Sequence, residues 1–360
     1  MRNRLRPAVA VVVAIATLSA PNTLASSAGR APADPTTLAV TSDIPFAADI
    51  DGDTKADLIV WRPGSGTWYW LTSSSGYDYA AQGQKQWGNQ TLGDVPLVGD
   101  MDADGKADLI VWRASTGTWY WLSSSSGYDY ATQGQKQWGN ASLGDVPFVA
   151  DMSDHANHLE PDRKADLVVW RASTRTWYWL SSRYGYDYNS AFSKQWGPAS
   201  AGDVPLIGDM DGDCTGSVCH RGDLILWHAA TGIWEWSTSR FGPDYQDNRT
   251  YQWGNQSLGD VPRVADMDGN GRGAFVIWRA STGTWYWVCQ FYYTDATIGS
   301  KQWGSQSAGD IPLPADIDGD GKADLIVWRA STGTWFWLTS SSAYDYAAQG
   351  QKQWGSGGTG

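Results

Sequence analysis

Residues 94–122 read DVPLVGDMDADGKADLIVWRASTGTWYWL, and the same order of residue types returns in five other parts of the chain. The tryptophans mark this repeat most plainly. There are 24 of them, and they form six groups of four, the first being Trp61, Trp68, Trp70 and Trp87. Within each group the spacing is seven, two and then sixteen or seventeen residues. Such a period indicates one supersecondary unit that is used six times.

Each unit predicts four short antiparallel strands. In the second copy these are residues 94–100, 107–113, 118–122 and 136–138, with a tight turn at 115–117. Neighbouring residues in the second and third strands are all apolar, so both faces of the sheet must be covered. Blades stacked around a ring meet this need, and we predict an all-β protein, a β-propeller of six blades with four antiparallel strands each. A seven-bladed ring is the alternative.

The repeats and their flanking sequences divide the chain into four parts. We expect a signal peptide at 1–28, a flexible leader at 29–42 and one propeller at 43–355, followed by a disordered tail at 356–360. The six predicted repeats are 43–93, 94–144, 145–202, 203–259, 260–309 and 310–355. The first begins with its inner strand and the last ends with its outer strand, so ring closure would rest on packing between these two blades.

The amino terminus predicts the compartment, and the net charge limits the possible partners. Arg2, Arg4 and Arg6 precede an uncharged apolar run at 7–20 that ends in small residues, as in a secretory signal peptide. This run is shorter than the roughly 20 residues of a spanning helix. We therefore expect a secreted, extracellular protein without a membrane span in its mature form, and a monomer. The net charge of −12 argues against nucleic acid as a partner, because such binding requires neutralisation of phosphates.

Aspartates alternate in the loop between the first and second strands of a repeat. The first loop carries Asp49, Asp51, Asp53, Lys55 and Asp57. Alternating carboxylates on a tight loop suit calcium, which takes six to eight oxygen ligands, with the lysine position contributing its backbone carbonyl. An EF-hand is excluded because its twelfth position, a glutamate, is here a valine within a strand.

Four loops keep enough carboxylates to predict a calcium site. The predicted metal-binding residues are Asp49, Asp51, Asp53, Lys55, Asp57, Asp100, Asp102, Asp104, Lys106, Asp108, Asp209, Asp211, Asp213, Asp223, Asp316, Asp318, Asp320, Lys322 and Asp324. The third loop has Ser153 in place of an aspartate and the fifth ends at Ala274, so we expect weak or absent binding there.

Insertions interrupt two of the loops. The fourth contains Cys214 and Cys219, close enough in sequence for a local disulfide in an oxidising compartment. Cys289 is expected to be a buried thiol. In the third loop, His155 and His158 suggest zinc, but a solvated polar insertion is the favoured interpretation.

The motif of residues 318–329, DGDGKADLIVWR, with 331–335 and the closing 353–355, resembles the FG-GAP/VCBS repeats of the integrin-α-like propeller superfamily. The resemblance implies a calcium-bearing propeller of secreted or cell-surface type. Members include integrin head domains, fungal sugar-binding lectins and exported bacterial proteins. Such propellers usually have seven blades, whereas six repeats are visible here. The family does not fix a function.

The function predicted first is non-enzymatic binding, lectin-like or adhesive, with an extracellular glycan or surface protein as partner. Aromatic rings stack on sugars, and a repeated loop places tyrosines on the side of the ring that carries the aspartate loops. The candidate ligand-binding residues are Tyr77, Tyr79, Tyr128, Tyr130, Tyr186, Tyr188, Tyr344 and Tyr346.

Two alternatives remain open. One is a polysaccharide lyase or hydrolase, for which His228 and Glu235 are the oddities: they break the repeat and share one hairpin. The other is a structural protein–protein interaction module. No set of residues in the sequence identifies a catalytic centre, and no catalytic residue is predicted.

Overall fold

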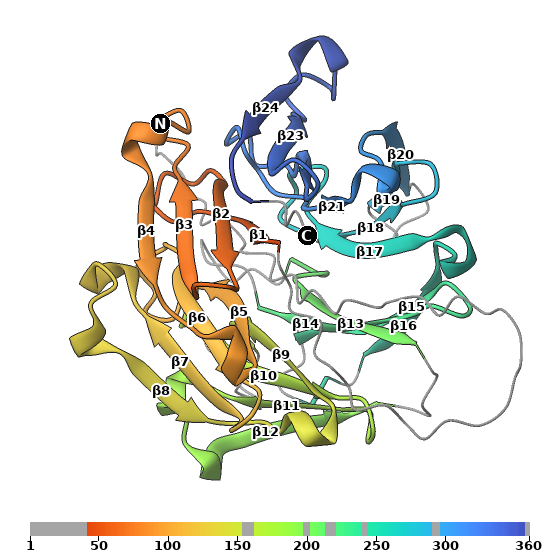
Figure 1. The fold of residues 1–360 in the computed structure, drawn as a ribbon. Helices are drawn as coiled ribbons and strands as arrows, with labels where there is room; N and C mark the ends of the chain where they lie inside the picture. Colours follow the sequence, from red (N-terminus) through yellow and green to blue (C-terminus); the bar gives the residue numbers. More distant parts are fainter. Residues whose placement is uncertain are drawn as a thin grey trace, which may run out of the picture.

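Six antiparallel sheets surround a common centre in the computed structural model (Figure 1). It describes residues 42–152, 162–196, 202–212, 221–239, 244–245, 247–289 and 296–356. The predicted signal peptide, nearly all of the leader and residues 357–360 lie outside these ranges, as do Asp213, Cys214 and Cys219. Within the described residues each sheet has four strands, which makes the protein a six-bladed β-propeller.

The blades are numbered along the chain, and the strands of each blade run in order from the centre to the rim (Figure 1). Blades 1 to 3 consist of β1 (Ile44–Ala48), β2 (Asp57–Arg62), β3 (Thr67–Leu71) and β4 (Gly83–Gln86); β5 (Asp94–Gly99), β6 (Asp108–Arg113), β7 (Thr118–Leu122) and β8 (Gly134–Gln137); and β9 (Asp145–Ala150), β10 (Asp166–Arg171), β11 (Thr176–Leu180) and β12 (Ala191–Gln195). Blades 4 to 6 consist of β13 (Asp203–Gly208), β14 (Asp223–His228), β15 (Ile233–Ser237) and β16 (Asn248–Gln252); β17 (Asp260–Ala265), β18 (Ala274–Arg279), β19 (Thr284–Cys289) and β20 (Thr297–Gln302); and β21 (Asp310–Pro312), β22 (Leu325–Arg329), β23 (Thr334–Leu338) and β24 (Gly350–Gln353).

Helical structure in the described part of the chain is limited to three-residue 3₁₀ turns. Those after the third strand are η1 (Tyr79–Ala81), η3 (Ser124–Ser126), η4 (Tyr130–Thr132), η6 (Ser182–Tyr184), η7 (Tyr188–Ser190) and η11 (Tyr346–Ala348). Those in the crossovers between blades are η2 (Gln90–Leu92), η5 (Ala141–Leu143), η9 (Gln256–Leu258) and η10 (Gln306–Ala308). No described helix is long and apolar enough to cross a membrane.

The apolar second and third strands are covered on both faces, as their sequences require. In β2 the five residues from Asp57 to Trp61 are all buried. Val98 from blade 2 belongs to the same hydrophobic cluster as Trp68 from blade 1, and similar clusters join the other neighbouring blades. The core is thus a ring of apolar layers between blades rather than a single central cluster.

In blades 1, 2, 4 and 5 the tryptophans also share a hydrogen-bond pattern within the blade. The indole Nε1 atoms of Trp61 and Trp68 both donate to the carbonyl of Trp87, each at 3.0 Å. Blade 2 repeats this with Trp112 and Trp119 on Trp138, at 3.1 and 2.9 Å. In these four blades two indoles from adjacent strands share one acceptor directly after the rim strand, whereas in blade 6 Trp335 donates to the Trp354 carbonyl and Trp328 Nε1 has no partner among the described residues.

Packing between blades 1 and 6 closes the ring. The Asp43 amide donates to the Ser356 carbonyl at 2.9 Å, and the Ser356 amide donates to Asp43 Oδ2 at 2.7 Å. Leu58 and Val60 of blade 1 share a hydrophobic cluster with Ile326 and Trp328 of blade 6. This is the closure expected from the way that the repeats begin and end.

Candidate functional site

The aspartate loops bring carboxylates together in four blades. In each of four groups, one oxygen per residue lies within 4.8 Å of the others. The groups are Asp49, Asp51 and Asp53; Asp100, Asp102 and Asp108; Asp209, Asp211 and Asp223; and Asp316, Asp318 and Asp320. They occur in the four loops from which calcium sites were predicted, and their all-oxygen donor sets suit a hard divalent cation.

The first and last aspartates of a loop also hold its backbone. The two Asp49 carboxylate oxygens accept the amides of Gly52 and Thr54, at 2.6 and 2.7 Å. Asp57 accepts the Ile50 amide and the Ser73 amide, each at 2.7 Å, and so ties the loop to the end of β3. Burial raises the pKa of Asp57 to about 7, and the backbone hydrogen bonds oppose this shift. A bound divalent cation would stabilise the ionised form of such a carboxyl.

The fifth loop, which lacks the last aspartate, separates the hydrogen bonds that form the turn from the candidate metal ligands. Asp266 accepts the amides of Gly269 and Gly271, each at 2.7 Å, so the turn forms as in the other loops. Ala274 occupies the position of Asp57 and offers no carboxylate. The turn therefore forms without the last aspartate, which in the other loops adds a candidate ligand.

Serines join the acidic groups from the loop after the third strand. Ser73 Oγ donates to Asp53 Oδ2 at 2.5 Å, and Ser74 Oγ donates to Asp51 Oδ2. Ser124 and Ser340 repeat the contact of Ser73, with Asp104 and Asp320. These hydroxyls are candidate oxygen ligands that were missed at the sequence level, although the Ser–Ser pair recurs at the repeat period.

The loop lysines point to the preceding blade. A methyl group added at Gly52 would lie 2.9 Å from Lys106 Cε, and one at Gly319 would lie 3.0 Å from Lys55 Cε. Lys322 packs in the same way on Gly269. Their side chains thus cover the neighbouring loop.

The eight candidate tyrosines fall into two kinds. Tyr77, Tyr128, Tyr186 and Tyr344 are partly buried, and their hydroxyls donate to the carbonyls of Ala56, Ala107, Ala165 and Ala323 at 2.9–3.1 Å. They lie beside the aspartate loops, on the expected side of the ring, but they serve packing. The other four expose about half of their surface.

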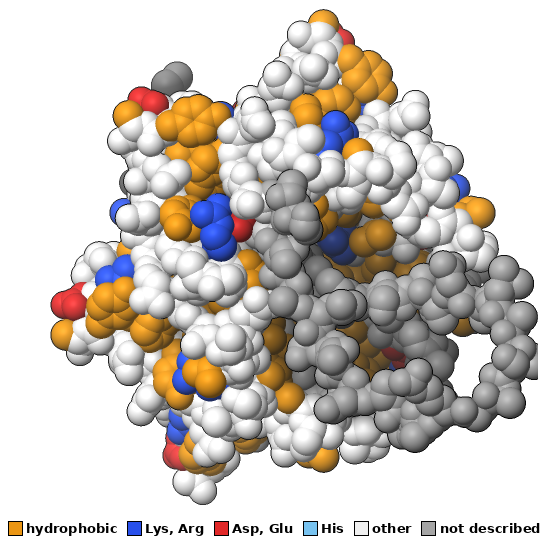
Figure 2. All heavy atoms as spheres, viewed as in Figure 1, with side chains coloured by type: hydrophobic (Ala, Val, Ile, Leu, Met, Phe, Trp, Pro, Cys, Tyr) orange, Lys and Arg blue, Asp and Glu red, His pale blue; other side chains and the backbone are white. Residues whose placement is uncertain are grey.

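The exposed tyrosines reach across to the preceding blade. Tyr130 Oη donates to the Gln86 carbonyl at 2.7 Å, and Lys85 Nζ lies 3.6 Å from the centre of the Tyr130 ring. Tyr79 makes the same contact across the closure, with Gln353 at 2.5 Å. Figure 2 shows Lys and Arg side chains adjoining hydrophobic ones around the ring. In Tyr130 and Tyr79, one face of the aromatic ring is therefore already covered by a lysine.

A groove of about 210 Å³ lies between blades 5 and 6. Its lining comprises Trp303 and Gly304 from blade 5 and Val327, Arg329, Phe336 and Gln349 from blade 6. Arg329 lies 4.6 Å from the centre of the Phe336 ring and pairs with the buried Asp310 at 2.7 Å. The buried Trp303 Nε1 has no hydrogen-bond partner among the described residues.

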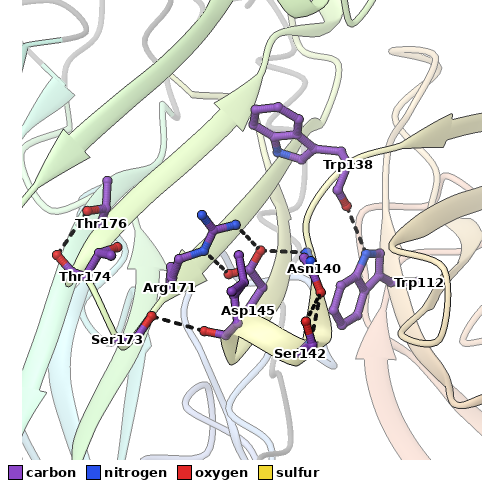
Figure 3. Close-up of polar contacts among 10 residues, drawn as sticks. Trp112, Trp138, Asn140, Ser142, Asp145, Arg171, Ser173, Thr174 and Thr176 are labelled. Atoms are coloured by element: carbon purple, nitrogen blue, oxygen red, sulfur yellow. Dashed lines mark hydrogen bonds and ion pairs between the residues drawn. The ribbon is translucent and has the colours of Figure 1, made fainter.

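The same residue types recur at the other interfaces. Figure 3 shows them at blades 2 and 3, where Arg171 from β10 pairs with Asp145 and the Trp138 indole lies nearby. The indole nitrogens of Trp87, Trp138 and Trp253 are buried and lack a partner within the described ranges, like that of Trp303. At the closure, by contrast, Trp354 Nε1 donates to Gln82 Oε1 at 2.8 Å. An unpaired buried donor is costly, so these positions suit a ligand that supplies an acceptor.

Blade 4 departs from this arrangement. Its Asp203 pairs with Arg175 of blade 3 at 3.0 Å and with His228 Nδ1 at 2.8 Å. His228 Nε2 lies 3.0 Å from Glu235 Oε2. The hydrogen bond to Glu235, with a smaller one to Asp203, raises the pKa of His228 against the effect of burial. The proximity of His228 and Glu235 was expected from their shared hairpin, whereas the ion pair between Arg175 and Asp203 was not.

Comparisons with known proteins agree with the fold. Residues 49–111 match a family model described as an FG-GAP-like repeat. No curated protein matches the sequence. Among solved structures, an Agrocybe aegerita lectin, described as specifically recognising non-reducing terminal N-acetylglucosamine, has a TM-score of 0.54 at 15% identity, over 87% of this chain and 80% of that one. Virginiamycin B lyase from Staphylococcus aureus has a TM-score of 0.48 at 10% identity, over 88% and 85%. At 15% identity the likeness to the lectin concerns the fold alone.

Proposed function

We propose that this chain, an FG-GAP-type β-propeller, is a secreted, calcium-stabilised protein that binds extracellular glycans through the grooves between its blades. The groove between blades 5 and 6 carries the proposal. Phe336 offers a ring, Arg329 and Gln349 offer donors, and the Trp303 indole offers a buried N–H without a partner among the described residues. Aromatic surface with a few fixed polar groups is what sugar recognition requires.

Other observations support parts of the proposal. The structurally similar lectin is described as recognising N-acetylglucosamine, which is consistent with a sugar-binding use of a propeller. The four carboxylate groups support bound calcium. The amino-terminal sequence supports export. Because several blade interfaces share the residue types of this groove, weak single sites would add up on a multivalent glycan surface.

A glycan array tests the proposal. We expect the protein to bind a defined set of glycans in calcium, and binding to fall after chelation because the loops adjoin the blade interfaces. Absence of binding to any glycan in calcium would contradict the proposal. Release of shortened oligosaccharides from a polysaccharide would favour the enzymatic alternative.

A further inference from the structure

The exposed charged groups at the blade 4 interface differ from those of the other blades and include a carboxylate. In the other five blades the second strand ends in an arginine whose side chain is 21–38% exposed, and the side chain of the paired aspartate is fully buried. The exposed partner of that pair is thus a cation. It lies over an aromatic ring of the third strand, as Arg171 does over Tyr178 at 4.9 Å.

Three substitutions reverse this order at blade 4. His228 replaces the arginine, Glu235 replaces the aromatic residue, and Arg175 replaces the glycine of the blade 3 hairpin turn. Arg175 supplies the missing guanidinium to Asp203, but its side chain is only 5% exposed. Glu235 is 20% exposed. A carboxylate beside an imidazole that is 15% exposed therefore stands where the other blades present a guanidinium and a ring.

The imidazole cannot act as a metal ligand in this arrangement. Its Nδ1 contacts Asp203 and its Nε2 contacts Glu235. Two carboxylates as partners require both nitrogens to carry hydrogen and to donate. Glu235 can accept further hydrogen bonds, because a carboxylate has about four acceptor positions. With the imidazole protonated, the charges of Arg175 and His228 balance those of Asp203 and Glu235, and the free acceptor positions of Glu235 suit a ligand that brings N–H donors.

We propose that the blade 4 interface binds a protonated amine, as on a hexosamine residue without its acetyl group, with Glu235 as the residue that pairs with it. This rests on the proposed function in taking the ligand to be a sugar. The grooves with an exposed arginine would disfavour such a ligand by like charge, and would take neutral or acidic sugars instead. One chain would then recognise two kinds of sugar at different interfaces.

Calorimetric titration with a glucosamine tetramer, at a pH where its amines are protonated, tests this. We expect one class of site in the wild-type protein and about tenfold weaker binding, or more, in Glu235→Gln, which keeps the shape of the side chain and removes its charge. Asp129→Asn, the same charge change at an exposed turn of blade 2, should leave binding unchanged. Added salt should weaken binding in the wild-type protein.

The fully N-acetylated tetramer separates this inference from the proposed function. Equal binding of the glucosamine tetramer by wild type and Glu235→Gln, or no binding of it at all, would overturn the amine site. Binding of the amine at Glu235 with no neutral glycan bound anywhere would contradict the broader proposal and leave the amine site standing. A melting temperature within a few degrees of wild type confirms that each variant is folded.

Discussion

At the scale of residues, the glycines opposite the rim-side tryptophans show how closely the repeat is packed. Gly134 faces Trp121 across β7 and β8, and a methyl group there would lie 1.9 Å from Trp121 Cε2. Gly83, Gly299 and Gly350 face Trp70, Trp287 and Trp337 in the same way. The tryptophan lies over the glycine, and the pair acts as one packing unit.

Gly134→Ala should therefore destabilise the protein by about 1–3 kcal/mol, because the added methyl group would displace the Trp121 ring. Urea unfolding measures the change. Gly64→Ala is the matched control: a methyl group added at Gly64 would have no described atom within 4 Å, and the residue has no positive φ, so the effect should stay within about 0.5 kcal/mol. Equal changes in unfolding free energy for the two variants would show that the close contact with Trp121 does not determine the effect of Gly134→Ala.

His228 gives a pH dependence with a definite sign. Its pKa is raised in the folded protein, so its contribution to stability is fully present below the unfolded pKa of about 6.5 and is lost as the pH rises through the folded value. The pKa of Glu235 is lowered by the His228 contact despite burial, so Glu235 stays ionised throughout this window. Arginine does not titrate there. The melting temperature of the wild-type protein should therefore fall relative to that of His228→Arg from near pH 6.5 upward. Melting temperatures that change with pH in parallel for the two proteins would contradict this.

At the scale of elements, the short turns after the third strands fasten each blade to the one before. The Tyr130 hydroxyl at the start of η4 binds blade 1, and Asp129 accepts the Ala131 amide at 3.0 Å and caps the turn. The lysine that covers the ring comes from β4 of blade 1. An exposed tyrosine on the rim is therefore a fastening between blades, and its free ring face remains a candidate sugar contact.

Tyr130→Ala should cost about 1–2 kcal/mol of unfolding free energy, because it removes a hydrogen bond and a cation–π contact. Tyr130→Phe keeps the ring and should cost less. Thermal unfolding and the glycan array are read on the same variants. If Tyr130→Ala loses glycan binding with no loss of stability, Tyr130 serves mainly to bind the ligand and not to hold blades 1 and 2 together.

At the scale of the whole molecule, the aspartate loops form a closed circle of hydrogen bonds. The Ala107 amide donates to the Asp49 carbonyl at 2.7 Å, and the Ala56 amide donates to the Asp316 carbonyl across the closure at 2.6 Å. Equivalent bonds join all six neighbouring pairs of loops. Any cation held by one loop would therefore stabilise contacts on both sides of it.

Removal of calcium should accordingly lower the melting temperature of the whole propeller in one transition. A site saturated a hundredfold above its Kd adds roughly 2.7 kcal/mol to stability. Differential scanning calorimetry with calcium and with chelator measures the shift, and readdition of calcium should reverse it. A melt that chelator leaves unchanged would contradict resident calcium.

The period of the sequence was sufficient to predict the blades, the carboxylate groups and the closure, because each depends on residues that recur in register. Contacts between blades were harder to predict. Arg175 lies 28 residues before Asp203, and only the adjacency of blades 3 and 4 brings them together. Tyr77 and Tyr79 look alike in sequence, yet the first is partly buried and the second exposed, because the turn directs their side chains differently. The unpaired Trp303 nitrogen depends on packing that a pattern does not reveal.

Trp303→Phe tests the central claim most directly. The Trp303 indole N–H has no partner among the residues that the structure describes, so its removal should cost no hydrogen bond, while a sugar acceptor in the groove would lose its donor. Calorimetric titration with a neutral glycan selected on the array should show up to about tenfold weaker binding at this groove, and thermal unfolding checks that the variant is folded. Unchanged affinity in Trp303→Phe would contradict glycan binding between blades 5 and 6.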